Sequence, residues 1–472
     1  MAFLDSLIDK SPVLAAYYGG KLLAQLADFA VGAGPGGVSN ILKREWIFSF
    51  SGVKNKEGGF SELFSYRNPA YKSATLRSII YLFCYGIDAF KRYYEEPEKY
   101  LWHEDIISPE IFHAMGLTPF VAEAIPIILP NLNSEITEHF IDVCENAGYP
   151  GDTCTLPKTV IGMVLEDQLP PPRAIVTSNS PCDGGMASYA VMEEKYKVPV
   201  FRLDLPYNFT DQRGLDYYLG ELNRMIAWLE EVYSVKMNYN RLREVCEEHN
   251  RMWQYTLDLW DLQRLSPAPI GGEAFVYAHL SYQIEGGTKA ATRVMRDMLR
   301  IARRSIERDG GGIPNERHRA ILWNPPPLVY PAAFSWMEEE YGTITVMDML
   351  SYRKNHFIDT SSVESMMRDL ARTLAFGPMA QHTRGPYENF FGDLFLMYES
   401  YNADMIIMAG HTGCKNTRAL LGMFKELCRK RSIPLLIFDY DLSDTRPMPP
   451  AGIRKQVADF MENIMGEKKG AP

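Results

Sequence analysis

Short apolar runs alternate with longer amphipathic stretches along the middle of the chain. The apolar run at 174–177 predicts a strand, because it is rich in β-branched residues and is bounded by polar turn residues. Residues 186–196 have apolar positions at helical spacing, and residues 198–203 form a second strand-like run. Strands that alternate with helices are typical of a parallel sheet, so this pattern predicts an α/β unit.

The same layout recurs near the end of the chain, with a strand at 404–408, a helix at 418–430 and a strand at 434–439. In both copies a polar loop that ends in a cysteine, Cys182 or Cys414, separates the first strand from the helix. Two such strand–helix–strand units predict two α/β domains of similar build. Each cysteine would lie at the carboxyl end of a strand, the edge where open parallel sheets bind ligands.

The remaining pattern divides the chain into four parts. Residues 1–105 predict a helical or irregular N-terminal extension, and residues 106–215 predict the first α/β domain. Residues 216–312 are mostly helical by pattern and end in a glycine-rich linker, so they predict a helical connecting region. Residues 313–472 predict the second α/β domain.

Composition and charge narrow the class of protein. The chain has 472 residues, of which 46% are hydrophobic and 23% charged, as in ordinary globular proteins. Its net charge of −10 argues against general nucleic-acid binding, since phosphate neutralisation requires clustered Lys and Arg. The best apolar stretch, 117–129, is too short for a membrane span, and the N-terminus lacks the basic region of a secretory signal. An odd count of seven thinly spread cysteines favours a reducing compartment, so we predict a cytoplasmic protein without nucleic-acid or membrane partners.

The seven cysteines fall into two groups. Four lie in apolar or helical stretches and predict structural roles: Cys84, Cys144, Cys246 and Cys428. The other three lie in loops among Gly, Pro, Asp, Thr or Ser residues: Cys154, Cys182 and Cys414. These three are either unrelated residues or a three-thiolate metal site, and thiolates favour zinc or iron–sulfur clusters. The chain has no C-x2-C pair, which argues against a ferredoxin-type carrier and a zinc ribbon.

Two polar residues are candidates for acid–base catalysis. His411 precedes Cys414 by three residues, and Glu273 ends the loop at 266–273. The alternative interpretation of each is a loop cap or a solvated side chain. The chain lacks a G-x4-G-K-[ST] phosphate loop, a G-x-S-x-G motif and an H-E-x-x-H motif, so the sequence predicts no nucleotide site of the phosphate-loop type.

Six segments spread over the chain carry a resemblance to a known family. The most specific are the two cysteine segments, GYPGDTCTLPKTVIGMVLEDQLPPPRAIVTSNSPCDGG from residue 148 and AGHTGCKNTRALLGMFKELCRKRSIPLLIFDYDLSDTR from residue 409. The others are SPEIFHAMGLTPF from residue 108, KVPVFRLDLPY from 197, PAPIGGEA from 267 and IRKQVADFMENI from 453. Together they resemble the 2-hydroxyacyl-CoA dehydratase and benzoyl-CoA reductase family over residues 106–466, and leave residues 1–105 unmatched.

The resemblance implies a fold, a cofactor and partners. It implies two flavodoxin-like parallel-sheet α/β domains with additional helical segments, and one [4Fe–4S] cluster bound by Cys154, Cys182 and Cys414. Three thiolates leave one iron open to another ligand. The resemblance also implies a heterodimer with a homologous subunit, an acyl-CoA substrate, and a separate ATP-hydrolysing iron–sulfur activator that delivers single electrons. The missing phosphate loop fits this arrangement, because the activator would bind the ATP.

The activity that the resemblance implies is elimination of water from an (R)-2-hydroxyacyl-CoA. The β-proton of such a thioester is hard to remove, but one-electron reduction of its carbonyl gives a ketyl radical that expels the α-hydroxyl group. The resulting enoxy radical has a far more acidic β-proton, and return of the electron gives the enoyl-CoA. The open iron would act as a Lewis acid as well as an electron relay. The alternatives are ring reduction of benzoyl-CoA and a non-catalytic companion chain that relays electrons.

Overall fold

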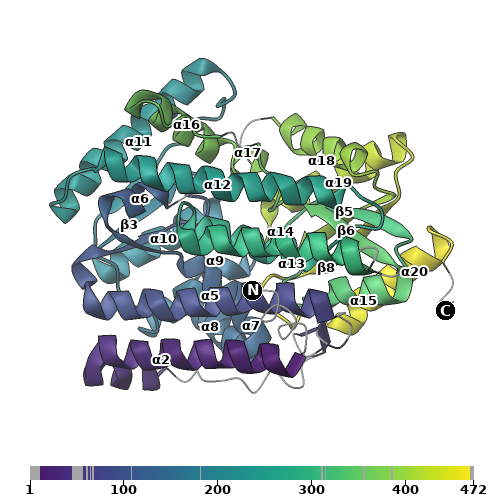
Figure 1. Cartoon of the computed structure of the whole chain (residues 1–472), viewed down its shortest axis with the longest axis horizontal. Helices are drawn as coiled ribbons and strands as arrows, with labels where there is room; N and C mark the ends of the chain where they lie inside the picture. The colour runs from purple at the N-terminus through teal and green to yellow at the C-terminus, as the bar shows by residue number, and fades with distance from the viewer. Residues whose placement is uncertain are drawn as a thin grey trace.

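The computed structural model describes most of the chain. The described residues are 11–44, 57–59, 62–63, 65, 69–107, 109–180, 182–309, 312–313, 315–354, 357–383 and 386–467. Residues 310 and 311 of the predicted linker lie outside this part. In Figure 1 the first sheet lies on the left and the second on the right, and long helices run across both.

Two four-stranded, all-parallel sheets form the centre of the fold. The first has the order β2-β1-β3-β4 and the second the order β6-β5-β7-β8. These are the first four positions of the flavodoxin-like order 2-1-3-4-5, so the expected α/β class with two flavodoxin-like sheets is confirmed. The strands are β1 (Tyr100–His103), β2 (Thr118–Phe120), β3 (Ala174–Ser178), β4 (Val200–Leu203), β5 (His318–Leu322), β6 (Thr343–Asp348), β7 (Met405–His411) and β8 (Leu435–Tyr440).

Helices cover both faces of each sheet, which explains why the central strands are apolar throughout. All five residues of β3 and all seven of β7 are buried. In β3, Ala174 and Val176 pack into one core with α11 (Gln212–Tyr233) and α16 (Val363–Ala375), whereas Ile175 packs into another. The alternation of side chains along a strand therefore supplies two cores from one apolar run.

The remaining helices follow the order of the chain. The first half contains α2 (Ser11–Leu42), α5 (Pro69–Glu95), α6 (Glu110–Met115), α7 (Ile125–Leu132), α8 (Ser134–Asn146), α9 (Thr155–Leu165) and α10 (Asp183–Tyr196). The second half contains α12 (Tyr239–Gln263), α13 (Gly272–Glu285), α14 (Lys289–Asp309), α15 (Ala332–Tyr341), α17 (Ala380–Thr383), α18 (Glu388–Ser400), α19 (Lys415–Lys430) and α20 (Pro450–Asn463). The helices α2, α5, α14 and α12 lie side by side in that order across the molecule (Figure 1).

Strands β1 and β2 were not expected from the sequence. β1 is only four residues long, and β2 contains Pro119, which removes one backbone donor. A proline is tolerated there because β2 is the edge strand of its sheet. The first sheet therefore begins at Tyr100, ahead of the boundary expected at residue 106.

The two sheets are joined near the carboxyl ends of their strands. The Asn131 side chain donates to the Leu328 carbonyl at 2.7 Å, and the Ser443 hydroxyl donates to the Pro126 carbonyl at 3.1 Å. Buried polar contacts of this kind fix the two halves relative to each other. Within the described residues, no helix is long and apolar enough to cross a bilayer.

Candidate functional site

Three cysteines each occupy the residue that precedes a helix. Cys154 is the N-cap of α9, Cys182 of α10 and Cys414 of α19. The N-terminus of a helix carries partial positive charge and free N–H groups, so it favours a negative ligand. Cys182 shows the local effect directly, because its sulfur accepts the Gly185 N–H at 3.4 Å.

The fold brings the three cysteine loops together. Cys182 follows β3 and Cys414 follows β7, at equivalent places in the two sheets, as the sequence predicted. The loop of Cys414 lies directly against Cys154, since a Cβ added to Gly413 would stand 2.6 Å from the Cys154 Cα atom. The loop of Cys182 reaches the same place, because a Cβ on Gly184 would stand 3.0 Å from the Thr153 side chain. Glycines at these points allow the loops to approach.

Burial disfavours bare thiolates at this site. It raises the pKa of Cys154 well above that of an ordinary thiol, and the neighbouring Cys182 raises it further. Burial also raises the pKa of Cys182 to about 12, against the lowering effect of the Gly185 N–H. Without a bound cation both sulfurs therefore keep their protons at neutral pH, and binding of a metal centre would release them.

The donor set consists of thiols, the side chains that bind soft metals and iron–sulfur clusters. No group of three or more His, Cys, Asp or Glu side chains in the described ranges is arranged to hold one metal ion. A single ion requires all its sulfur ligands at about 2.3 Å, whereas a four-iron cluster distributes its thiolates over several irons. Three soft donors from three loops, each at a positive helix end, are of the type that an iron–sulfur cluster takes.

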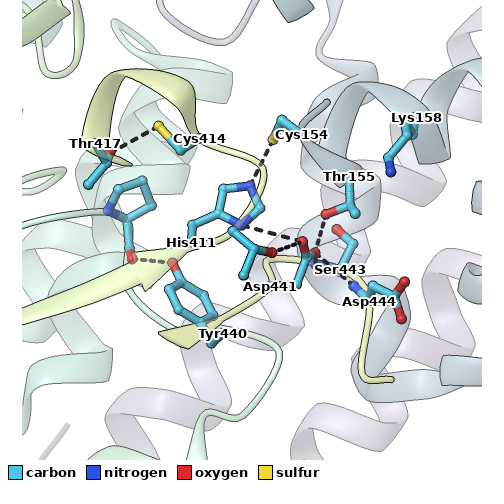
Figure 2. A network of polar contacts seen from close by, with 12 residues as sticks. Cys154, Thr155, Lys158, His411, Cys414, Thr417, Tyr440, Asp441, Ser443 and Asp444 are labelled. Atoms are coloured by element: carbon cyan, nitrogen blue, oxygen red, sulfur yellow. Dashed lines mark hydrogen bonds and ion pairs between the residues drawn. The ribbon is translucent and has the colours of Figure 1, made fainter. Parts of the chain in front are cut away.

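His411 and Asp441 connect the two sheets at Cys154 (Figure 2). His411 ends β7 and is 1% exposed, with its Nε2 atom 3.1 Å from the Cys154 sulfur. Its Nδ1 atom lies 3.6 Å from the Oδ2 atom of Asp441. Asp441 follows β8 and also accepts a hydrogen bond from the Thr155 hydroxyl. Burial lowers the pKa of His411, and the charge of Asp441 opposes this effect. The sequence placed His411 beside Cys414, but its side chain contacts Cys154.

Lys158 fixes the loop before Cys154. Its side chain is 4% exposed and pairs with Glu145 at 2.6 Å, and its ammonium also donates to the Gly151 carbonyl at 2.9 Å. Because Lys158 lies one turn into α9, it ties this loop to the helix whose N-terminus Cys154 caps. Nothing in the sequence indicated this role, since lysines are usually solvated.

The second predicted acid–base residue lies on a different element. Glu273 is fully buried in the first turn of α13, not in a loop. α13 packs against β6, the outer strand of the second sheet, whereas Cys414 follows β7. The structure therefore does not place Glu273 on the strand ends that carry the cysteines.

A different acid, Glu104, lies at the site. It follows β1, and its Oε2 atom accepts the Ser178 N–H at 2.7 Å and the Thr177 hydroxyl at 3.3 Å. Its Oε1 atom is buried, has no hydrogen-bond partner among the described residues, and would stand 3.5 Å from a Cβ on Gly185. Burial raises its pKa well above that of an ordinary carboxyl, and Glu123, whose own pKa is raised to about 8, adds to the effect. Sequence reasoning missed Glu104 because it missed β1.

The other four cysteines lie within helices. Cys144, Cys246 and Cys428 are buried in α8, α12 and α19, and Cys84 is half-buried in α5. Their positions agree with the structural roles predicted for them. Only the three loop cysteines among the seven stand at helix N-termini.

Comparison with known proteins gives consistent results. Residues 107–464 match the family model described as 2-hydroxyglutaryl-CoA dehydratase, D-component. The chain is 22% identical to one of the subunits of benzoyl-CoA reductase from Thauera aromatica over 347 residues, which are 69% of this chain and 80% of that protein. It is 22% identical to the (R)-phenyllactyl-CoA dehydratase alpha subunit of Clostridium sporogenes over 345 residues, 70% and 81% of the two chains.

A shorter match points the same way. Over 135 residues, 28% of each chain, the protein is 23% identical to the alpha subunit of (R)-2-hydroxyglutaryl-CoA dehydratase from Acidaminococcus fermentans. The resemblance inferred from the cysteine segments is thus confirmed. Residues 1–106 lie outside the family match. Since that match extends over well more than half of the chain, this protein belongs to the 2-hydroxyglutaryl-CoA dehydratase D-component family.

Proposed function

We propose that this protein is a subunit of an oxygen-sensitive [4Fe–4S] dehydratase that eliminates water from an (R)-2-hydroxyacyl-CoA. The proposal rests on one observation above all: each of the three cysteines precedes a helix, and the backbone around Cys154 lies against the segments that contain Cys182 and Cys414. Cys154, Cys182 and Cys414 hold the cluster. When bound, the cluster supplies single-electron transfer and a Lewis-acidic iron.

The surrounding residues suit the site to the binding of a charged group and an acyl thioester. The three helix ends stabilise negative charge on the thiolates. Gly184 and Gly413 keep the loops close enough to share one centre. The switch point between β1 and β3, where Glu104 lies, is the place at which folds of this class bind ligands.

We propose Glu104 as the group that holds a proton for the reaction. Burial raises its pKa well above that of an ordinary carboxyl, which favours the protonated form, and its unpartnered Oε1 atom lies near Gly185 and the N-terminus of α10. A neutral carboxyl there can donate to the departing hydroxyl group. His411 and Glu273, the candidates from the sequence, remain proposals for the same role.

Replacing Glu104 with Gln tests this role. Gln keeps the shape of the side chain and loses the acidic proton, so we expect kcat to fall by about 10²–10⁴. The Glu104 carboxyl holds its proton more tightly in the folded protein than in the unfolded chain. Its contribution to the free energy of unfolding therefore falls as the pH rises above 4.5. Denaturant unfolding at several pH values should therefore show a weaker pH dependence for Glu104→Gln. Glu273→Gln tests the competing candidate, and an equal or greater loss of kcat in that variant would contradict the assignment to Glu104.

The proposal includes partners and a location. The relatives are named as subunits of dehydratases and of a reductase, which supports a partner subunit here. We propose that this partner is homologous to the chain, that a separate ATP-hydrolysing iron–sulfur activator delivers the electrons, and that the complex is cytoplasmic. The boundaries at residues 215 and 312 remain predictions.

Ring reduction of benzoyl-CoA is the second candidate. The observation that favours it is the match to the benzoyl-CoA reductase chain of Thauera aromatica, which extends over 80% of that protein. A dehydratase returns its electron after each turnover, whereas a reductase leaves its electrons in the product.

Counting electrons separates these activities. With its partner subunit and activator, the protein should convert a 2-hydroxyacyl-CoA to the enoyl-CoA with far fewer electrons than product molecules. Stoichiometric consumption of electrons with benzoyl-CoA would contradict the dehydratase proposal. Unchanged turnover by a complex that lacks only the cluster of this chain would instead indicate a companion role.

A further inference from the structure

The imidazole of His411 lies between two acceptors. Its Nε2 atom faces the sulfur of Cys154 at 3.1 Å, and its Nδ1 atom faces the carboxylate of Asp441 at 3.6 Å. The ring is 1% exposed, so water does not compete for either nitrogen. A thiolate that ligates iron has no proton, and the contact with Cys154 can then exist only as an Nε2–H donated to sulfur.

Asp441 is held rigidly on the other side of the ring (Figure 2). The backbone N–H groups of Ser443 and Asp444 each donate to its Oδ1 atom at 3.0 Å. The Thr412 hydroxyl donates to Oδ2 at 3.0 Å, and the Thr155 hydroxyl donates to Oδ1. A carboxylate with this many donors is fixed in place beside the ring, and its Oδ2 atom lies 3.6 Å from Nδ1, beyond hydrogen-bond distance.

The three sulfurs differ in the donors that face them. Cys182 accepts the backbone N–H of Gly185 at 3.4 Å. Cys414 lies 3.0 Å from the Thr417 hydroxyl, whose proton is donated to the Asn324 side chain at 2.9 Å. Among the hydrogen bonds of these sulfurs within the described residues, the one at Cys154 is made with a side-chain ring nitrogen.

We propose that His411 is a positioning residue whose Nε2–H donates a hydrogen bond to the ligating sulfur of Cys154 and thereby raises the reduction potential of the cluster. This inference rests on the proposed function. A donor to sulfur withdraws charge from the ligand and stabilises the reduced, more negative state, and such hydrogen bonds are one of the means by which proteins set cluster potentials. The contact also makes the second sheet, through β7, a direct partner of a ligand from the first half.

The test compares two variants of the anaerobically purified full chain. His411→Leu removes the donor, and His411→Gln keeps an amide N–H near the place of Nε2. Iron content is measured first, and redox titration followed by EPR then gives the potential. We expect His411→Leu to make reduction less favourable by about tenfold or more, which is about 59 mV for a one-electron couple. His411→Gln should remain closer to the wild type.

Thr417→Val is the matched control at a second sulfur. The Thr417 hydroxyl donates its proton to the Asn324 side chain and not to the Cys414 sulfur. Removing this hydroxyl should therefore shift the reduction potential less than His411→Leu does. If His411→Leu takes up no iron, His411→Met decides, since it fills more of the ring volume and also lacks an N–H. A lowered potential in His411→Met then supports the inference, and a wild-type potential overturns it.

The possible failures can be told apart. A wild-type chain that binds no cluster would overturn the proposed function together with this inference. A wild-type cluster whose potential is unchanged in His411→Leu would overturn the inference alone. Equal shifts in His411→Leu and Thr417→Val would also contradict it, because they would show a general effect of substitutions near the site.

Discussion

Cys182→Ala is expected to abolish cluster binding. The variant leaves two thiolates from two loops, and it removes the cap of α10 that stands at the end of β3. Residues that only support metal ligands contribute about 10–100-fold to affinity, so loss of a ligand itself should cost more than about 100-fold. Anaerobic reconstitution followed by iron and sulfide analysis measures the loss, and dehydration of the acyl thioester should disappear with it.

The controls are cysteines outside the site. Cys246 and Cys428 are buried within α12 and α19, and their alanine variants should keep the iron content of the wild type. Cys154→Ala and Cys414→Ala should behave like Cys182→Ala. A Cys182→Ala protein with the full iron content would show that the three-cysteine assignment is wrong.

Gly413→Ala should disrupt the same site without removing a ligand. A Cβ at this position would stand 2.6 Å from the Cα atom and 3.0 Å from the backbone nitrogen of Cys154, where no flexible side chain can yield. The two loops must then separate, which we expect to lower the free energy of unfolding by about 1–3 kcal/mol and to reduce iron content. Urea unfolding of the anaerobic protein and iron analysis measure both effects.

Gly422→Ala is the matched control for this prediction. Gly422 lies inside α19, and a Cβ there would meet no atom within 4 Å. Alanine should therefore stabilise the helix by about 0.5–1 kcal/mol and leave the iron content unchanged. If Gly413→Ala matched Gly422→Ala in both measurements, the close contact between the loops of Cys154 and Cys414 would not exist in solution.

Much of the central fold could be predicted because buried parallel strands leave a clear pattern. β3 and β7 are buried along their full length, so each reads as an apolar run followed by a polar loop. The loops of Cys182 and Cys414 follow those runs, and their shared position indicated one site. β1 and β2 escaped prediction because one is only four residues long and the other contains a proline.

The chemistry around the cysteines depends on tertiary contacts that spacing does not encode. His411 is close to Cys414 in sequence, yet its imidazole contacts Cys154, 257 positions away. Glu104 could be recognised as a candidate only from the structure, because β1 places it at the switch point of the first sheet. Glu273 was a candidate equal to His411 in the sequence, because sequence alone does not show that it lies on α13, beside β6.

The central claim is that one cluster is bound at the junction of the two sheets. Iron and labile sulfide content, together with EPR of the dithionite-reduced protein purified without oxygen, tests this claim most directly. We predict about four iron atoms per chain and a reducible cluster signal. A protein that takes up no iron after anaerobic reconstitution would contradict the claim, and would leave Cys154, Cys182 and Cys414 as ordinary thiols at three helix ends.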